Sequence, residues 1–192
     1  MRWTHRVPLA LTLLRALLGP VVLACAVWWP IRAIFSVCLI LAFLSDVFDG
    51  VIARKLGIAT AGLRRLDSVA DSIFYLCACI AAYHLYPQAI LDRLMPLSAL
   101  AGLEVLRYVV DYAKYRRETS YHMWSSKLWG IFLFAGFLSL LGFGHAGVLV
   151  TLAIVMGIVA DIEGLLISAV LKDWRHDVPT LVHAWRISSP KI

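Results

Sequence analysis

The sequence predicts an all-α integral membrane protein with six transmembrane helices. Of its 192 residues, 61% are hydrophobic and only 16% are charged, whereas a soluble domain usually carries about 25% charged residues. The apolar residues gather in runs of the length that crosses a bilayer, about 20 residues. No polar stretch between these runs is long enough to fold by itself, so we expect residues 1–192 to form a single membrane domain.

Short connections that contain helix breakers separate the apolar runs. Such residues stand at Pro30, at Pro87 and between positions 142 and 147. Arg2 and Arg6 precede the first run as they would in a signal peptide, but Arg15 and Pro20 interrupt it, so we expect an uncleaved first helix. The predicted spans are 8–28, 32–53, 66–87, 94–114, 124–143 and 146–171.

Lysine and arginine gather on alternate sides of the predicted spans. The first and third connections contain only Arg32 and Arg93, and the fifth contains neither residue type. The positive-inside rule therefore places both termini in the cytoplasm, and we expect a multi-pass protein of the inner (cytoplasmic) membrane. The net charge of +6 then reflects topology, and we expect no nucleic-acid partner. The residues on the cytoplasmic side are Arg2, Arg6, Arg54, Lys55, Arg64, Arg65, Lys114, Arg116, Arg117, Lys127, Lys172, Arg175, Arg186 and Lys191.

Four aspartates cluster at the predicted cytoplasmic ends of the second and third spans. Asp46 and Asp49 are three residues apart, and Asp67 and Asp71 are four apart, so each pair shares one helix face. Carboxylates are costly near a bilayer, so four of them need a common reason to be there. Two facing pairs would present up to eight oxygens, which suits hard divalent cations. The alternative is a solvated or salt-bridged face, whose candidate partners are Arg54, Arg64 and Arg65.

Small residues and an arginine follow the first aspartate pair. Gly50 and Ala53 would let a bulky ligand approach the helix backbone closely. Arg54 would neutralise a phosphate through its planar guanidinium group. Carboxylates, small residues and an arginine together favour a metal–diphosphate ligand, because two cations polarise a phosphoryl group and stabilise a leaving phosphate.

This stretch resembles the CDP-alcohol phosphatidyltransferase family, whose members carry D-x2-D-G-x2-A-R-x8-G-x3-D-x3-D across the second and third of six membrane helices. The motif's second glycine would fall at position 63, where this chain has Leu63, and Gly62 lies one residue earlier. The first span also resembles the family, in which P-N-x-x-T-x-x-R-x4-P is common, although Leu9 replaces the asparagine. The matching residues are Pro8, Thr12, Arg15, Pro20, Asp46, Asp49, Gly50, Ala53, Arg54, Asp67 and Asp71.

The resemblance implies a reaction and a role for each motif residue. A phosphatidyl group would pass from CDP-diacylglycerol to a small alcohol, CMP would leave, and two Mg²⁺ or Mn²⁺ ions would assist. Asp46, Asp49 and Asp67 would hold the metals with a contribution from Asp71, which would also be the general base. The donor-binding residues would include Asp46 and Arg54, of which Arg54 would contact donor phosphate. The residues beside the cytidine would be Gly50 and Ala53.

Further charged residues lie in the later spans. Glu104, Arg107 and Asp111 share one face of the fourth span, either as a salt-bridge ladder or with Arg107 as an acceptor ligand. Lys127 precedes the fifth span, and a basic pocket there would favour a phosphorylated acceptor such as glycerol 3-phosphate. The intramembrane acids Asp161 and Glu163 would serve catalysis, helix contacts or a dimer interface.

Three alternatives to this function stay open at the level of the sequence. The first is the same chemistry with another acceptor, such as inositol phosphate or serine. The second is a transporter-like protein that binds cations through its carboxylates, although the aspartates gather at one membrane face. The third is an inactive scaffold with the family's fold. A homodimer in the lipid bilayer is compatible with each of them.

Overall fold

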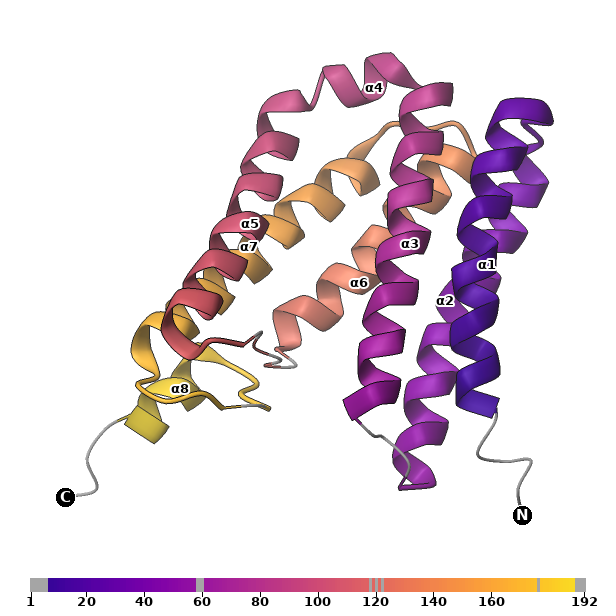
Figure 1. Ribbon diagram of the computed structural model, residues 1–192. Helices are drawn as coiled ribbons and strands as arrows, with labels where there is room; N and C mark the ends of the chain where they lie inside the picture. Colours follow the sequence, from indigo (N-terminus) through magenta and orange to yellow (C-terminus); the bar gives the residue numbers. More distant parts are fainter. Residues whose placement is uncertain are drawn as a thin grey trace. The chain divides into compact units, whose positions relative to one another are not determined.

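The computed structural model describes residues 7–57, 61–117, 119, 121, 123–175 and 177–188, and these contain helices and no strand (Figure 1). The helices are α1 (Val7–Trp28), α2 (Arg32–Lys55), α3 (Ala61–Leu85), α4 (Pro87–Leu91), α5 (Leu94–Tyr115), α6 (Trp124–Phe137), α7 (Val148–Val170) and α8 (Leu181–Ser188), with a π-helical segment, η2 (Leu138–Gly142), continuing α6. The prediction of an all-α membrane protein is confirmed.

Each of the six predicted spans coincides with a long helix, and α6 together with η2 forms the fifth. Within the described residues, five helices are long and apolar enough to cross a membrane, namely α1, α2, α3, α6 with η2, and α7. Helix α5 has a similar length but carries four charged side chains, Glu104, Arg107, Asp111 and Lys114. The count of six spans and the cytoplasmic termini therefore stay predictions.

Two short helices were not expected from the sequence. Pro87 begins α4 directly after Tyr86, where a proline needs no hydrogen-bond partner for its nitrogen. Helix α8 lies in the basic tail and exposes Trp185, whereas its Ala184 is buried. Such short helices lack the long apolar run from which a transmembrane helix is predicted.

The chain forms two compact units. The first comprises residues 1–91 and 137–146, and the second comprises residues 92–136 and 147–192. The first unit thus holds α1 to α4 and η2, and the second holds α5, nearly all of α6, α7 and α8. The prediction of a single domain over the whole chain stays a prediction.

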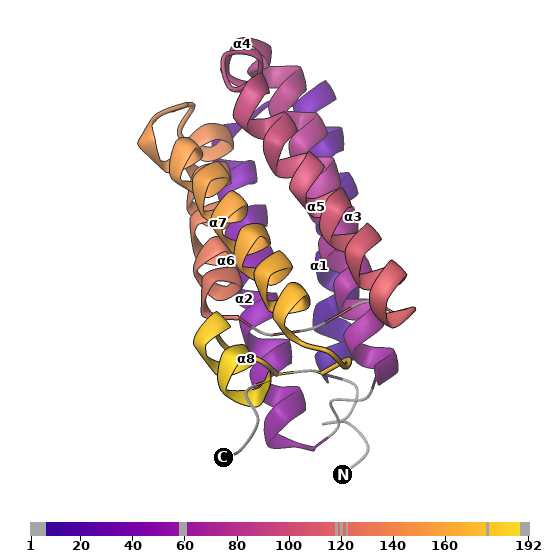
Figure 2. The ribbon, with the colours of Figure 1, turned by 90° about the vertical axis from the view of Figure 1, so that its left-hand side faces the viewer.

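Helix α1 packs against both α2 and α3 in the first unit (Figures 1 and 2). Its closest approach to α3 is at Gly19, where an added Cβ would lie 2.9 Å from the Cα of Phe74. Small buried residues on α3, such as Ala78 and Ala82, continue this close packing. Lipid tails are as apolar as the side chains, so association of these helices depends on close van der Waals contact.

Helix α2 ends in a turn at Leu56 and Gly57. The N–H group of Leu56 donates to the carbonyl oxygen of Ile52, 3.0 Å away, and Gly57 adopts a left-handed conformation with φ of 66°. The end of α2 and the beginning of α3 lie at the same end of the first unit (Figure 1). The two predicted aspartate pairs are on these helix ends.

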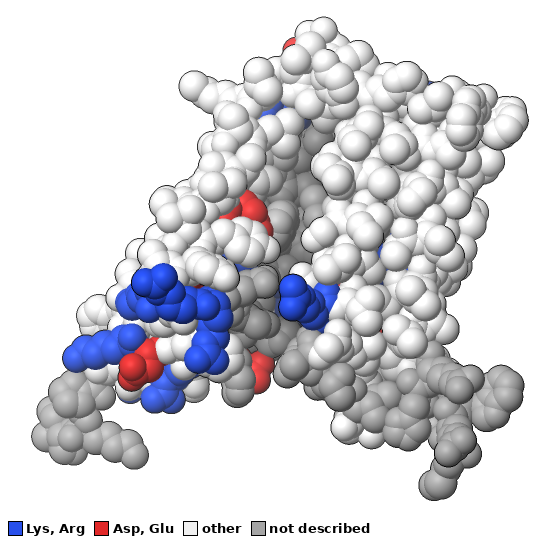
Figure 3. All heavy atoms as spheres, viewed as in Figure 1, with Lys and Arg blue, Asp and Glu red and all other residues white. Residues whose placement is uncertain are grey.

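The second unit is built on α7, which packs against α5 and α8. Helix α6 reaches α7 where Gly136 faces Ala153, and buried residues from α7, α8 and the loops form an apolar cluster. The ends of α5 and α7 are followed by a gathering of lysine and arginine side chains, which Figure 3 shows on this unit. Its basic residues include Lys114, Arg116, Arg117, Lys172 and Arg175.

We expect Gly19→Ala to lower the stability of the protein by about 1–3 kcal/mol, as overpacking does elsewhere. The new methyl group would meet the α3 backbone at Phe74, which cannot rotate away as a side chain would. Thermal unfolding in detergent measures the effect.

The matched control is Gly102→Ala in α5, where an added Cβ meets no atom within 4 Å. Alanine is the better helix former by up to about 1 kcal/mol, so this variant should be neutral or slightly more stable. Equal shifts in both variants would contradict the importance of the α1–α3 contact.

Candidate functional site

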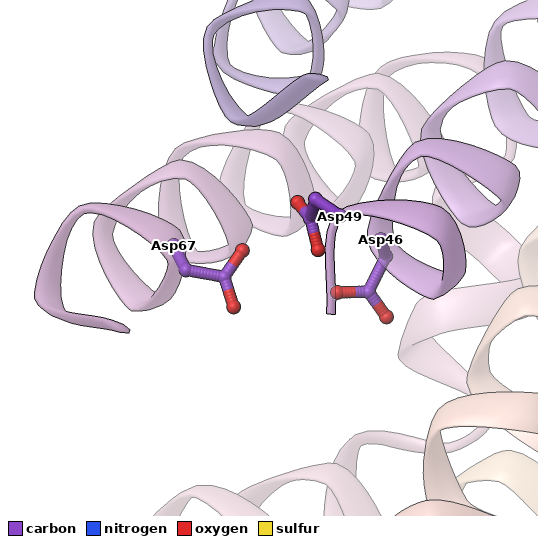
Figure 4. A group of neighbouring side chains, drawn as sticks. All are labelled: Asp46, Asp49 and Asp67. Atoms are coloured by element: carbon purple, nitrogen blue, oxygen red, sulfur yellow. The ribbon is translucent and has the colours of Figure 1, made fainter. Parts of the chain in front are cut away.

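Three aspartates from two helices converge at one end of the first unit. Asp46 and Asp49 come from α2 and Asp67 from α3, and Figure 4 shows their carboxyl groups directed toward one another. One oxygen of each lies within 4.8 Å of the others. The side chain of Asp49 is 5% exposed, whereas those of Asp46 and Asp67 are 48% and 36% exposed. The cluster therefore has a buried side and an open side.

Arg15 of α1 joins all four predicted aspartates. Its Nη1 donates to Oδ1 of Asp46 and to Oδ1 of Asp71. Its Nη2 donates to Oδ2 of Asp49, at 2.8 Å, and to Oδ1 of Asp67. The two terminal nitrogens of a guanidinium group carry four N–H donors, and each aspartate receives one bond. The four residues that the sequence grouped by spacing thus surround one cation of the protein itself.

The burial of Arg15 makes this arrangement energetically demanding. The residue is 1% exposed, and an arginine at that depth is costly unless it is paired and hydrogen-bonded. The surrounding carboxylates satisfy Nη1 and Nη2, whereas Nε is buried and has no hydrogen-bond partner among the described residues. The site keeps a formal charge of −3 when all four carboxylates are ionised. An excess of carboxylate charge on a partly open surface attracts divalent cations.

Helix α1 contributes a second polar residue one turn earlier. The hydroxyl of Thr12 donates to the carbonyl oxygen of Pro8 at 3.0 Å and lies 3.4 Å from Oδ2 of Asp49. Both Thr12 and Arg15 are buried. Positions three apart share a helix face, so Thr12 and Arg15 both face the aspartates from α1.

The small residues of the predicted motif also lie on this part of α2. Ala53 is buried and Gly50 is half-buried. Gly62 lies one residue before the position of the motif's second glycine. An added Cβ at Gly62 would meet no atom within 4 Å, so packing within the described residues does not require a glycine there. The side chain of Arg54 lies outside the described residues.

A family model described as CDP-alcohol phosphatidyltransferase matches residues 5–160, which include Arg15 and all four aspartates. The chain belongs to the CDP-alcohol phosphatidyltransferase family. Searches of curated proteins and of solved structures found no match. The family transfers substituted phosphate groups in phospholipid synthesis, so the protein is a membrane transferase. This assignment favours the transferase over the cation-transporter alternative.

The family's patterns included both Arg15 and the aspartates but did not predict that they contact one another. The candidates named from the sequence were Arg54, Arg64 and Arg65, because they are nearest along the chain. Arg65 is exposed, and the side chains of Arg54 and Arg64 lie outside the described residues. The partner is Arg15, and the signal that could have found it is a single arginine in an otherwise apolar helix.

In the second unit, Arg107 pairs with a different helix from the one predicted. Its Nη1 donates to Oδ1 of Asp161 on α7 at 2.9 Å, so it links α5 to α7. The second oxygen of Asp161 and Oε2 of Glu104 are both buried, and these two carboxyl groups lie next to each other. A ladder along α5 is thus replaced by an ion pair between helices, and Asp161 has the helix-contact role that the sequence left open.

Asp111 belongs to a buried hydrogen-bond network at the ends of α5 and α7. It accepts bonds from the hydroxyl of Thr119 and, at 2.7 Å, from the hydroxyl of Ser168. Because Ser168 uses its only hydroxyl proton on Asp111, the hydroxyl of Tyr121 donates to Ser168 at 2.8 Å. Nζ of Lys114 donates to the backbone carbonyl of Ser168 at 2.6 Å. This network satisfies the last turn of α7.

Two further predicted residues lie near the beginning of α6. Lys127 has its Nζ 4.5 Å from the ring centre of Trp124. Glu163 of α7 accepts a bond from the hydroxyl of Ser125 at 2.5 Å and another from the N–H of Leu181 at 3.2 Å. Glu163 thereby connects α7 to α6 and α8. His122, two residues before the beginning of α6, lies outside the described residues.

We expect Arg107 and Asp161 to be energetically coupled. Asp161→Asn removes the charge that holds Arg107, and a double-mutant cycle with Arg107→Gln should give a coupling of about 0.5–3 kcal/mol, as contacting residues do. Thermal unfolding of the two single variants and the double variant in detergent measures it.

The control pairs Arg107→Gln with Asp92→Asn, because Asp92 is exposed at the beginning of the second unit. This cycle should close to within about 0.5 kcal/mol. Additive effects of Arg107→Gln and Asp161→Asn would show that the ion pair adds nothing to stability.

Proposed function

We propose that this transferase moves a phosphatidyl group from CDP-diacylglycerol to glycerol 3-phosphate and releases CMP. The observation that carries the proposal is the family match over a chain whose four motif aspartates meet around Arg15. The donor would lie in the bilayer with its nucleotide at the cytoplasmic face, which the distribution of lysine and arginine favours.

Two divalent cations, Mg²⁺ or Mn²⁺, are the cofactors that suit this site. The family generally depends on divalent cations, and the donor set of Asp46, Asp49 and Asp67 offers carboxylate oxygens within 4.8 Å of one another. Hard cations prefer such oxygens, and Asp71 adds a fourth carboxylate through its contact with Arg15. When bound, the cations would polarise the diphosphate and stabilise the leaving phosphate.

The residues of the chain would then divide the remaining work. Gly50 and Ala53 leave room beside α2 for the cytidine, and Arg54 pairs with donor phosphate. Asp71 accepts the proton of the acceptor hydroxyl. At the same time the hydroxyl oxygen of the acceptor forms a bond to the phosphorus on the lipid side of the diphosphate. The bond from that phosphorus to the CMP oxygen breaks, and CMP carries away the electron pair.

We expect Asp71→Asn to lower CMP release by about 10²–10⁴-fold, the usual effect of losing a general base. Asp67→Asn should also abolish release, because it removes a carboxylate from the cation site. The assay measures CMP formed from CDP-diacylglycerol by the purified protein in mixed micelles. EDTA should stop the reaction, and Mg²⁺ or Mn²⁺ should restore it.

The matched control is Asp92→Asn, which removes an exposed carboxylate outside the motif. Its activity should equal that of the unchanged protein. Full activity of either motif variant, or of the protein in EDTA, would sink the proposed mechanism.

The choice of glycerol 3-phosphate rests on the basic residues of the second unit. A phosphorylated acceptor needs positive side chains, and the candidates from the sequence are Arg107 and Lys127. Arg107 already holds Asp161, so its charge is partly engaged. Lys127 is therefore the stronger candidate for the acceptor phosphate. The alternative acceptors, inositol phosphate and serine, would attack the same phosphorus.

In a panel of acceptors with radiolabelled CDP-diacylglycerol, we expect product from glycerol 3-phosphate. Lys127→Gln should raise the KM for this acceptor about tenfold, the equivalent of one charge-assisted hydrogen bond, and leave the KM for the donor unchanged. Lys172→Gln, which removes an exposed lysine after α7, is the control and should change neither constant. Reaction with unphosphorylated alcohols alone would refute the basic-pocket argument.

A further inference from the structure

Arg15 bonds to only one of the two oxygens of each of the four carboxylates. It contacts Oδ1 of Asp46, Asp67 and Asp71 and Oδ2 of Asp49, one oxygen from each residue. A carboxylate has two oxygens with about four lone-pair directions, so a bond to one oxygen leaves the other able to bind a cation. The four N–H donors of Nη1 and Nη2 are matched one to one with the four aspartates.

The guanidinium group lies on the buried side of the cluster. The side chain of Arg15 is 2% exposed, whereas those of Asp46, Asp67 and Asp71 are each more than one third exposed. The contact between Gly19 and α3, one turn farther along α1, holds this part of α1 close to α3. Ions from solution would reach the aspartates from the side opposite Arg15.

Like charges at this separation repel one another, and the repulsion grows as water is excluded. Asp46, Asp49 and Asp67 have oxygens within 4.8 Å of one another, so they need a positive group to keep them together. Arg15 supplies it from α1, a helix outside the aspartate motif. Four aspartates, Arg15 and two divalent cations would sum to a charge of +1, which suits an anionic diphosphate.

We propose that Arg15 is the positioning residue of the cation site: it binds one oxygen of each aspartate from the buried side and directs the other oxygens to two divalent cations on the open side. This inference rests on the proposed cation-dependent transfer. Residues that orient metal ligands from behind typically contribute 10–100-fold to metal affinity. Arg15 does so for four ligands at once.

The test measures Mn²⁺ bound to the purified, detergent-solubilised protein by electron paramagnetic resonance. We expect two Mn²⁺ per chain with the signature of a magnetically coupled pair. Arg15→Gln and Arg15→Lys should each weaken binding by about 10–100-fold and abolish the coupled signal. Lysine keeps the charge but has a single nitrogen, which cannot reach four carboxylates in this geometry. The control, Arg65→Gln, removes an exposed positive charge from α3 and should keep the coupled pair.

Unchanged or tighter Mn²⁺ binding in Arg15→Gln would overturn the proposal, because Arg15 would then compete with the cations. Full restoration by Arg15→Lys would also overturn it, since charge alone would suffice. If neither variant folds, crystals of the unchanged protein are soaked in Mn²⁺, and anomalous diffraction locates the ions relative to Arg15. Mn²⁺ on the opposite oxygens with Arg15 still bonded supports the proposal, and displacement of Arg15 refutes it. None of these measurements requires phosphatidyl transfer. A protein that binds a coupled Mn²⁺ pair but releases no CMP would therefore contradict the proposed reaction and not the role of Arg15.

Discussion

The first unit depends on the contact between one buried guanidinium group and four carboxylates. Arg15 would be too costly at its depth without anionic partners, and the aspartates would repel one another without a cation. Arg15 and the aspartates can meet each other's requirement only if α1, α2 and α3 come together at one end. The close approach of α1 to α3 at Gly19 supports that meeting.

Charged groups in the second unit follow the same rule with a different outcome. Arg107 is held by Asp161, Asp111 by hydroxyl groups, and Glu163 by Ser125 together with a backbone N–H. These bonds join α5, α6, α7 and α8, so the polar residues there connect helices that apolar contacts alone would leave free to slide. A residue engaged in this way, such as Arg107, is less available to a substrate than its sequence position suggests.

Family membership and the geometry of the site concern different parts of the reaction. Membership of the CDP-alcohol phosphatidyltransferase family sets the reaction class and the CDP-linked donor. The geometry adds that the motif aspartates share one cationic partner and retain an open, negatively charged side. The acceptor is recognised by other residues, which is why the proposal for glycerol 3-phosphate rests on Lys127 rather than on the motif.

The sequence by itself determined the membrane class, the helix positions and the aspartate cluster, because apolar run length and helical spacing are local properties of the chain. The sequence did not predict the short helices α4 and α8, because they are too short to show that apolar periodicity. Only the tertiary structure decided the partners: Arg15 lies 31 residues before Asp46, and Arg107 lies 54 residues before Asp161. A buried charge selects its partner by distance in space, and sequence spacing reports that distance only within one helix.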